Sequence, residues 1–149
     1  MRIAVIADTH NHLPVSLLDS IAGADEIWHL GDVTDRWILA RIGELKRPFK
    51  MVRGNCDSDM SWPPHLDFTI AGLKIRLIHI PPAQAPPGTD LLLHGHTHVP
   101  RRERVGDAWF LNPGCITRPN RGAPSSYAWL TLEEGKPYGW EIHPIFDRS

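Results

Sequence analysis

The sequence predicts an α/β protein in which two mixed sheets pack face to face with helices on the outside. The first third of the chain alternates apolar, strand-like runs with helix-like segments, which is the order that builds a parallel sheet. From residue 67 onward, short strand-like runs separated by turn residues replace this alternation and indicate a second sheet. With 149 residues the chain is long enough to bury a core, so we expect a single domain over residues 1–149.

The first third is expected to hold three strands and two helices. Residues 2–7 form a continuous apolar run, which is typical of a central strand covered on both faces. Pro14 suits the first turn of a helix that ends before Gly23. Asp35 is a suitable N-cap for a second helix, which Pro48 prevents from continuing. The other two strands expected here are residues 26–30 and 49–53.

The rest of the chain is expected to contribute short strands joined by turns. Residues 67–70 and 74–80 flank an Ala71-Gly72 turn and predict a hairpin. The proline-rich residues 81–88 predict a stiff surface loop rather than a linker between domains. Further strands are expected at residues 91–94, 103–105, 108–111, 127–132 and 138–142.

Charge and composition argue against several classes of partner. Sixteen basic and seventeen acidic residues give a net charge of −1, so neither bulk nucleic acid nor an anionic membrane is expected to bind. Two cysteines are too few for a disulfide framework, and no apolar stretch approaches the ~18 residues of a spanning helix. We therefore expect a cytoplasmic protein, and a homo-oligomer is compatible with the sequence.

Metal-binding side chains follow five of the expected strands. Ligands of an open α/β sheet bind at the carboxyl ends of its strands, so these side chains are expected to meet. Carboxylate, amide oxygen and imidazole without thiolate suit borderline ions such as Mn, Fe, Zn, Co or Ni better than a structural zinc site. The candidate ligands are Asp8, His10, Asp32, Asn55, His79, His96 and His98.

This set of donors is suited to two metal ions. Asp32 has two carboxylate oxygens and can bridge both. Gly31, Gly54 and Gly95 each precede a ligand, where we expect a positive φ or a close approach of the backbone. Two ions about 3.5 to 4 Å apart hold a hydroxide at neutral pH and stabilise the charge of a phosphoryl group in its transition state. The residues therefore point to phosphoryl-transfer chemistry.

Six motifs in order resemble those of the calcineurin-like binuclear metallophosphoesterase superfamily, most closely its small bacterial and archaeal phosphodiesterase branch. The eukaryotic retromer subunit of the same fold is also similar. The resemblance runs from residue 1 to about residue 132. The motifs are Asp8-x-His10, Gly31-Asp32-x-x-Asp35, Gly54-Asn55-Cys56-Asp57, His79, Gly95-His96-x-His98 and Asn112-Pro113-Gly114.

The resemblance implies an αββα sandwich and a metal-dependent phosphoesterase, with phosphodiesters as the favoured substrates. Small or activated phosphate esters would be hydrolysed by a hydroxide that bridges two divalent metals. Manganese is the favoured metal, with Ni, Fe, Zn or Co as alternatives. Metal 1 would bind Asp8, His10, Asp32 and His98, and metal 2 would bind Asp32, Asn55, His79 and His96. The residues expected to act in catalysis are Asp32, Asn55, His10 and His96.

The chain departs from the family pattern at two places. Family members usually have Gly after the histidine at position 79 and then a helix, whereas Ile80 and a short proline-rich loop follow here. Cys56 occupies the position where many larger relatives have a histidine that protonates the leaving group. Without that acid, substrates with good leaving groups are expected to be favoured.

An alternative reading is a catalytically weak protein-binding module that retains the fold. The shortened loop and Trp62, which precedes two prolines, suggest it. His79 and His96 argue against it, because a scaffold need not keep a second metal shell.

Other side chains leave two roles open: His12, Arg101, Arg102, Arg104, Arg118 and Arg121 either contact substrate or form a solvated face. Core or surface roles are expected for His29, His65, His94 and His143.

Overall fold

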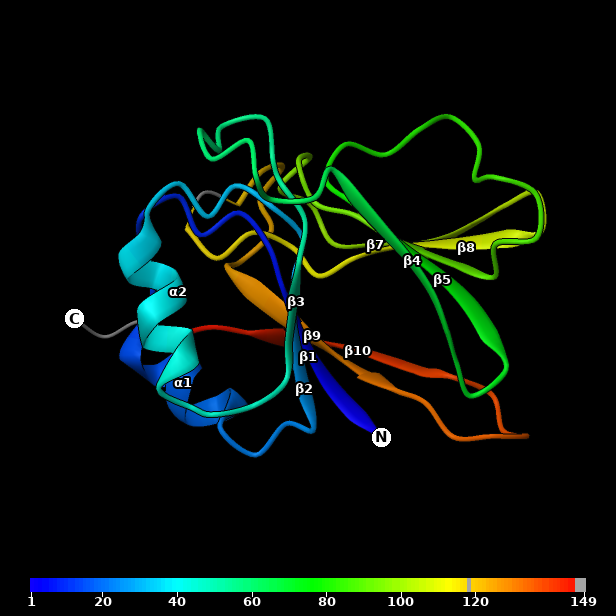
Figure 1. Ribbon diagram of the computed structural model, residues 1–149, viewed down its shortest axis with the longest axis horizontal. Coiled ribbons are helices and arrows are strands. Elements are labelled where there is room, and N and C mark those ends of the chain that lie inside the picture. Colours follow the sequence, from blue (N-terminus) through cyan, green and yellow to red (C-terminus); the bar gives the residue numbers. More distant parts are fainter. Residues whose placement is uncertain (118, 147–149) are drawn as a thin grey trace.

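The structure is a computed structural model that describes residues 1–117 and 119–146 (Figure 1). The elements in chain order are β1 (Arg2–Ile6), α1 (Val15–Ile21), β2 (Glu26–His29), α2 (Arg36–Gly43), β3 (Phe49–Met51), β4 (His65–Ile70), β5 (Leu73–Ile78), β6 (Leu91–Leu93), β7 (Arg101–Val105), β8 (Ala108–Asn112), β9 (Ser126–Thr131) and β10 (Gly139–Pro144). One sheet has the order β10-β9-β1-β2-β3 and the other β4-β5-β6-β8-β7. Two mixed five-stranded sheets confirm the expected fold class.

The first sheet is built around β1. This strand pairs in parallel with β2 and antiparallel with β9, and β3 extends the parallel part beyond β2. Successive side chains of a strand point to opposite faces. Ile3 and Val5 therefore contact the core between the sheets, while Ala4 and Ile6 contact the core beneath the helices. Both faces of β1 are buried, as its apolar run predicts.

The two outer faces of the molecule are covered differently. Both helices lie together on the outer face of the first sheet (Figure 1). In the described part of the chain no helix covers the second sheet, where Ala85 of the loop between β5 and β6 packs beside Leu92 and Phe110. The four prolines at positions 81, 82, 86 and 87 disfavour a helix in that loop. Within the described residues no helix is both long and apolar enough to span a bilayer.

The edge strands of the second sheet are longer than the sequence predicts. β4 begins at His65 and β7 at Arg101, two residues before the expected starts in each case, while β3 ends at Met51 rather than at residue 53. β7 is polar from Arg101 to Arg104, so no apolar alternation marks its start. β4 does alternate between exposed and half-buried residues, and this alternation begins at His65, before the expected start.

Asp35 caps α2 as expected, because its side chain accepts a hydrogen bond from the backbone N–H of Trp37 at 3.1 Å. Asp35→Ala removes this acceptor and is expected to lower the free energy of unfolding by about 1 kcal/mol. Urea denaturation measures the change. Asp35→Asn keeps an acceptor and serves as the control, so an equal loss in both variants would contradict the capping role.

Candidate metal centre

All seven candidate ligands lie in the loops that follow β1, β2, β3, β5 and β6. These loops gather at one edge of the two sheets, at the top in Figure 1. Three overlapping groups of side chains there place their ligand atoms within 4.8 Å of one another. The groups are Asp8, His10 and His98; Asp8, Asp32 and His79; and His10, Asp32 and Cys56.

Asp8 presents a buried carboxylate oxygen to three imidazoles. Its Oδ1 lies 3.6 Å from His98 Nε2 and 3.8 Å from Nε2 of both His10 and His79. None of the described residues donates a hydrogen bond to this oxygen, although Asp8 is fully buried. A buried carboxylate oxygen is costly without a hydrogen bond or a cation, so the surroundings fit a bound metal ion.

Asp32 lies between the two sets of histidines. Its Oδ2 is 3.5 Å from His10 Nε2 and 3.3 Å from His79 Nε2. The other oxygen, Oδ1, accepts a hydrogen bond of 2.8 Å from the backbone N–H of Cys56, which fixes the orientation of the carboxylate. One carboxylate oxygen therefore faces imidazoles from both proposed metal sites.

Asn55, His79 and His96 form the second set. Asn55 Oδ1 lies 2.9 Å from His79 Nε2 and 3.1 Å from His96 Nδ1. His79 Nδ1 is 2.8 Å from the carbonyl oxygen of Leu30. With a metal bound, a proton on Nδ1 would donate to that carbonyl and leave the lone pair of Nε2 for the ion, the arrangement common for metal-bound histidine.

Several of these ligands have a strained backbone. The φ angles of Asp8, His10, Asp32, His96 and His98 are 57°, 43°, 60°, 72° and 60°. Left-handed conformations at residues other than glycine cost of the order of 1 kcal/mol and gather at functional sites. The three glycines that precede ligands were expected to have a positive φ or a close backbone contact, and they do. Gly31 has a φ of 103°. A Cβ added at Gly54 would lie 2.1 Å from a carboxylate oxygen, and one added at Gly95 would lie 2.8 Å from another.

Burial and hydrogen bonding give the carboxylates of Asp8 and Asp32 different pKa values. Burial raises the pKa of Asp8 to about 6. Burial also acts on Asp32, but hydrogen bonds from His79 and the Cys56 N–H outweigh it and lower the pKa of Asp32 to about 2. The same two carboxylates outweigh the burial of His79 and raise its pKa. A cation stabilises ionised carboxylates, so metal binding is expected to release the proton that Asp8 retains below about pH 6.

Asp57 supports the centre in a way that the sequence reasoning did not identify. Its carboxylate accepts hydrogen bonds from three backbone N–H groups: Asp32 at 2.9 Å, Gly54 at 2.7 Å and Thr34 at 2.8 Å. It thereby holds the loop after β2 against the loop after β3. Its place in the Gly54-Asn55-Cys56-Asp57 motif was the available signal.

His29 is a second support, from the buried strand β2. Its Nδ1 accepts a hydrogen bond from the Gly31 N–H at 3.0 Å, and its Nε2 lies 3.1 Å from Thr9 Oγ1. Complete burial lowers the pKa of His29 to about 3, so the ring is neutral. It links the loops after β1 and β2, and nothing in its apolar sequence context distinguishes it from a core residue.

The remaining candidates lie at the margin or away from the centre. His94 is buried and His65 and His143 lie toward the surface, as expected. His12 is exposed beside the centre, and Arg118 lies outside the described residues. Arg101 and Arg121 line one cavity next to His96, whereas Arg102 and Arg104 are exposed on β7.

Comparison with known proteins identifies relatives over most of the chain. Residues 1–135 match the calcineurin-like phosphoesterase superfamily domain. A probable metallophosphoesterase of Methanocaldococcus jannaschii is 34% identical in an alignment of 136 positions that covers 80% of this chain and 70% of that protein. The phosphodiesterase YfcE of Escherichia coli K12 is 29% identical over 160 residues, covering 87% of each chain.

Solved structures show the same fold. The structure of the Escherichia coli phosphoesterase YfcE superposes with a TM-score of 0.77 at 27% identity and covers 88% of both chains. Vps29 of Entamoeba histolytica in complex with zinc gives a TM-score of 0.76 at 21% identity, covering 96% of this chain and 98% of that one.

Proposed function

This chain belongs to the calcineurin-like phosphoesterase superfamily, and from that membership we propose that it is a phosphodiesterase that uses two divalent metal ions. Small or activated phosphate esters are its substrates, and manganese is the favoured metal. The observation that carries the proposal is Asp32 Oδ2, which faces the imidazoles of His10 and His79 at 3.5 and 3.3 Å. A carboxylate so placed suits a ligand shared by two cations.

The residues divide between the two ions. Asp8, His10 and His98 would hold one ion, Asn55, His79 and His96 the other, and Asp32 both. Such a pair of ions polarises phosphoryl oxygens and lowers the pKa of water. Asn55 and His96 are exposed, so they border the side from which substrate enters, whereas Asp8, Asp32 and His79 are buried beneath them. Asp57 and His29 act through the backbone by holding the ligand loops in position.

Hydrolysis of bis(4-nitrophenyl) phosphate tests the proposal. Protein stripped of metal and reloaded with Mn or Ni is expected to bind two ions per chain and to release 4-nitrophenolate in a metal-dependent manner. Asp8→Ala should lose both properties, because Asp8 presents its buried oxygen to the first ion. Absence of metal-stimulated turnover in fully loaded protein would refute the proposal.

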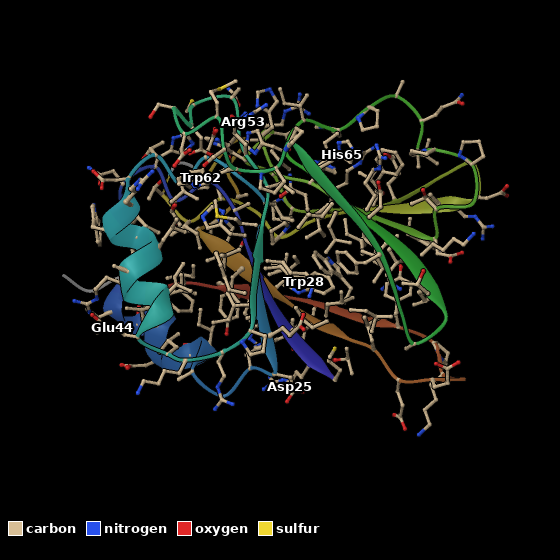
Figure 2. All side chains as sticks on the ribbon, in the orientation of Figure 1. Asp25, Trp28, Glu44, Arg53, Trp62 and His65 are labelled. Atoms are coloured by element: carbon tan, nitrogen blue, oxygen red, sulfur yellow. The ribbon has the colours of Figure 1, made fainter. Side chains whose placement is uncertain are left out.

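The alternative, a protein-binding module, receives less support from the geometry. Trp62 suggested an exposed docking site from the sequence. In the structure this side chain is half-buried and packs against the core on the helix side of the molecule (Figure 2). The similarity to Vps29 concerns the fold. Metal counting separates the two functions, since two ions favour the enzyme, while zero or one ion without turnover favours the module.

Cys56→His is expected to raise turnover of esters with poor leaving groups. The Cys56 thiol lies within 4.8 Å of ligand atoms of His10 and Asp32, and burial together with the charge of Asp32 raises its pKa, so it is a poor proton donor at neutral pH. An imidazole there is a better general acid, and roughly ten-fold faster release of phenolate is a conservative expectation.

The rates with phenolate and with 4-nitrophenolate as leaving groups measure the effect of Cys56→His. Cys56→Ala is the control and should give no gain with either ester. An equal gain for both leaving groups would contradict a role in proton donation, because 4-nitrophenolate needs little protonation.

A further inference from the structure

A cavity of about 510 Å³ adjoins the candidate metal centre. Its lining includes His96, Val99, Pro100, Arg101, Asn120 and Arg121. His96 is both a candidate metal ligand and part of the cavity lining, so a phosphate ester with its phosphorus at the centre can extend one substituent into this cavity. The volume lies within the range of ordinary small-molecule sites.

Arg101 lines the cavity and is held in place by three contacts. Its Nη1 lies 3.2 Å from His94 Nε2, its Nε donates to Glu103 Oε1 at 3.0 Å, and its guanidinium stacks 4.8 Å from the centre of the Phe110 ring. Glu103 balances much of the charge of Arg101. This arginine therefore shapes the wall more than it attracts an anion.

Asn120 and Arg121 also line the cavity, and Arg121 adds a positive charge that no described residue pairs with. Asn120 is tied to the ligand loop, because its N–H donates to the carbonyl oxygen of His98 at 3.0 Å. The neighbouring Arg121 is exposed, and its guanidinium forms no ion pair with another described residue. Val99 and Pro100 add apolar side chains to the same lining. The cavity lining thus combines apolar side chains with a cationic one.

Resting on the proposed phosphodiesterase function, we propose that this cavity selects phosphodiesters in which one substituent has an apolar or aromatic body that ends in an anion, and that Arg121 is the residue that recognises the anion. A guanidinium binds carboxylate and phosphate groups through paired N–H donors. The metal centre holds the phosphoryl group, and the cavity holds the far end of the same molecule.

Two benzylphosphonates that are not hydrolysed test this selection, one with a meta carboxylate and one with a meta carboxamide. Calorimetry on protein loaded with Mn is expected to give a Kd roughly five-fold lower for the carboxylate, the size of effect of a partly exposed ion pair. Raising the salt concentration should shrink the ratio. Arg121→Gln is expected to bind the two compounds with equal affinity.

The control is Arg104→Gln, because Arg104 is an exposed arginine on β7 that is not part of the cavity lining and donates to the carbonyl oxygen of Gly106. This variant should keep the preference for the carboxylate. Equal affinities in the unmodified protein, a preference that survives Arg121→Gln, or no binding of either phosphonate would each overturn the inference. Absent turnover of bis(4-nitrophenyl) phosphate with this preference intact would refute only the proposed function.

Discussion

Asp32→Asn is expected to reduce kcat/KM for bis(4-nitrophenyl) phosphate by about 10³-fold, the size of loss seen when a preorganised electrostatic group of an active site is removed. The variant keeps an acceptor for the Cys56 N–H and a side chain of the same shape, so the loop should remain in place. What it loses is the negative charge between His10 and His79. We expect metal content to fall from two ions per chain to one or none.

Metal analysis and steady-state kinetics on the same samples measure this effect, and circular dichroism checks the fold. Asp19→Asn is the matched control, because Asp19 is an exposed residue of α1 in the outer helical layer and belongs to none of the candidate metal-binding groups. It should leave metal content and kinetics as they are. If Asp32→Asn retained two ions and most of the activity, a role for the Asp32 carboxylate as a ligand shared by both ions would be excluded.

The fold was predictable wherever burial is strong. The continuous apolar run of β1 and the capping residue Asp35 fix their elements locally, and both have the expected form. The starts of β4 and β7 were less predictable, because each strand begins with a polar residue and pairs with only one neighbour, β5 and β8 respectively. The replacement of a helical layer by the proline-rich loop followed from proline chemistry once the family was recognised.

The candidate site was predictable as a set of residue types but not as a network. Each candidate ligand follows a strand, so topology alone brings these residues to one edge. The supporting residues could not be predicted because they bind backbone groups distant in sequence: the Asp57 carboxylate accepts from the N–H of Asp32, 25 residues away. A histidine such as His29, inside an apolar strand, shows its role only when its partners, Gly31 and Thr9, are in place.

Gly54→Ala is expected to disrupt the metal centre without changing any ligand. A Cβ added at this position would lie 2.1 Å from Asp32 Oδ1 and 2.2 Å from the Asp32 backbone nitrogen. Neither atom can retreat easily, because Oδ1 accepts from the Cys56 N–H and the nitrogen donates to Asp57. Overpacking of such a fixed contact costs about 1–3 kcal/mol or more. We expect that loss in the free energy of unfolding of the metal-free protein, together with loss of bound metal and turnover.

Gly43→Ala separates this steric effect from a general effect of replacing glycine. Gly43 is the last residue of α2, no heavy atom lies within 4 Å of an added Cβ there, and its φ is not positive. Alanine is therefore expected to be neutral or to stabilise the helix by up to about 1 kcal/mol, with metal content and kinetics retained. If Gly54→Ala bound two ions and turned over substrate like Gly43→Ala, the close contact between Gly54 and Asp32 would be contradicted. The packing of the loops after β2 and β3 would then not be what holds the Asp32 carboxylate in position.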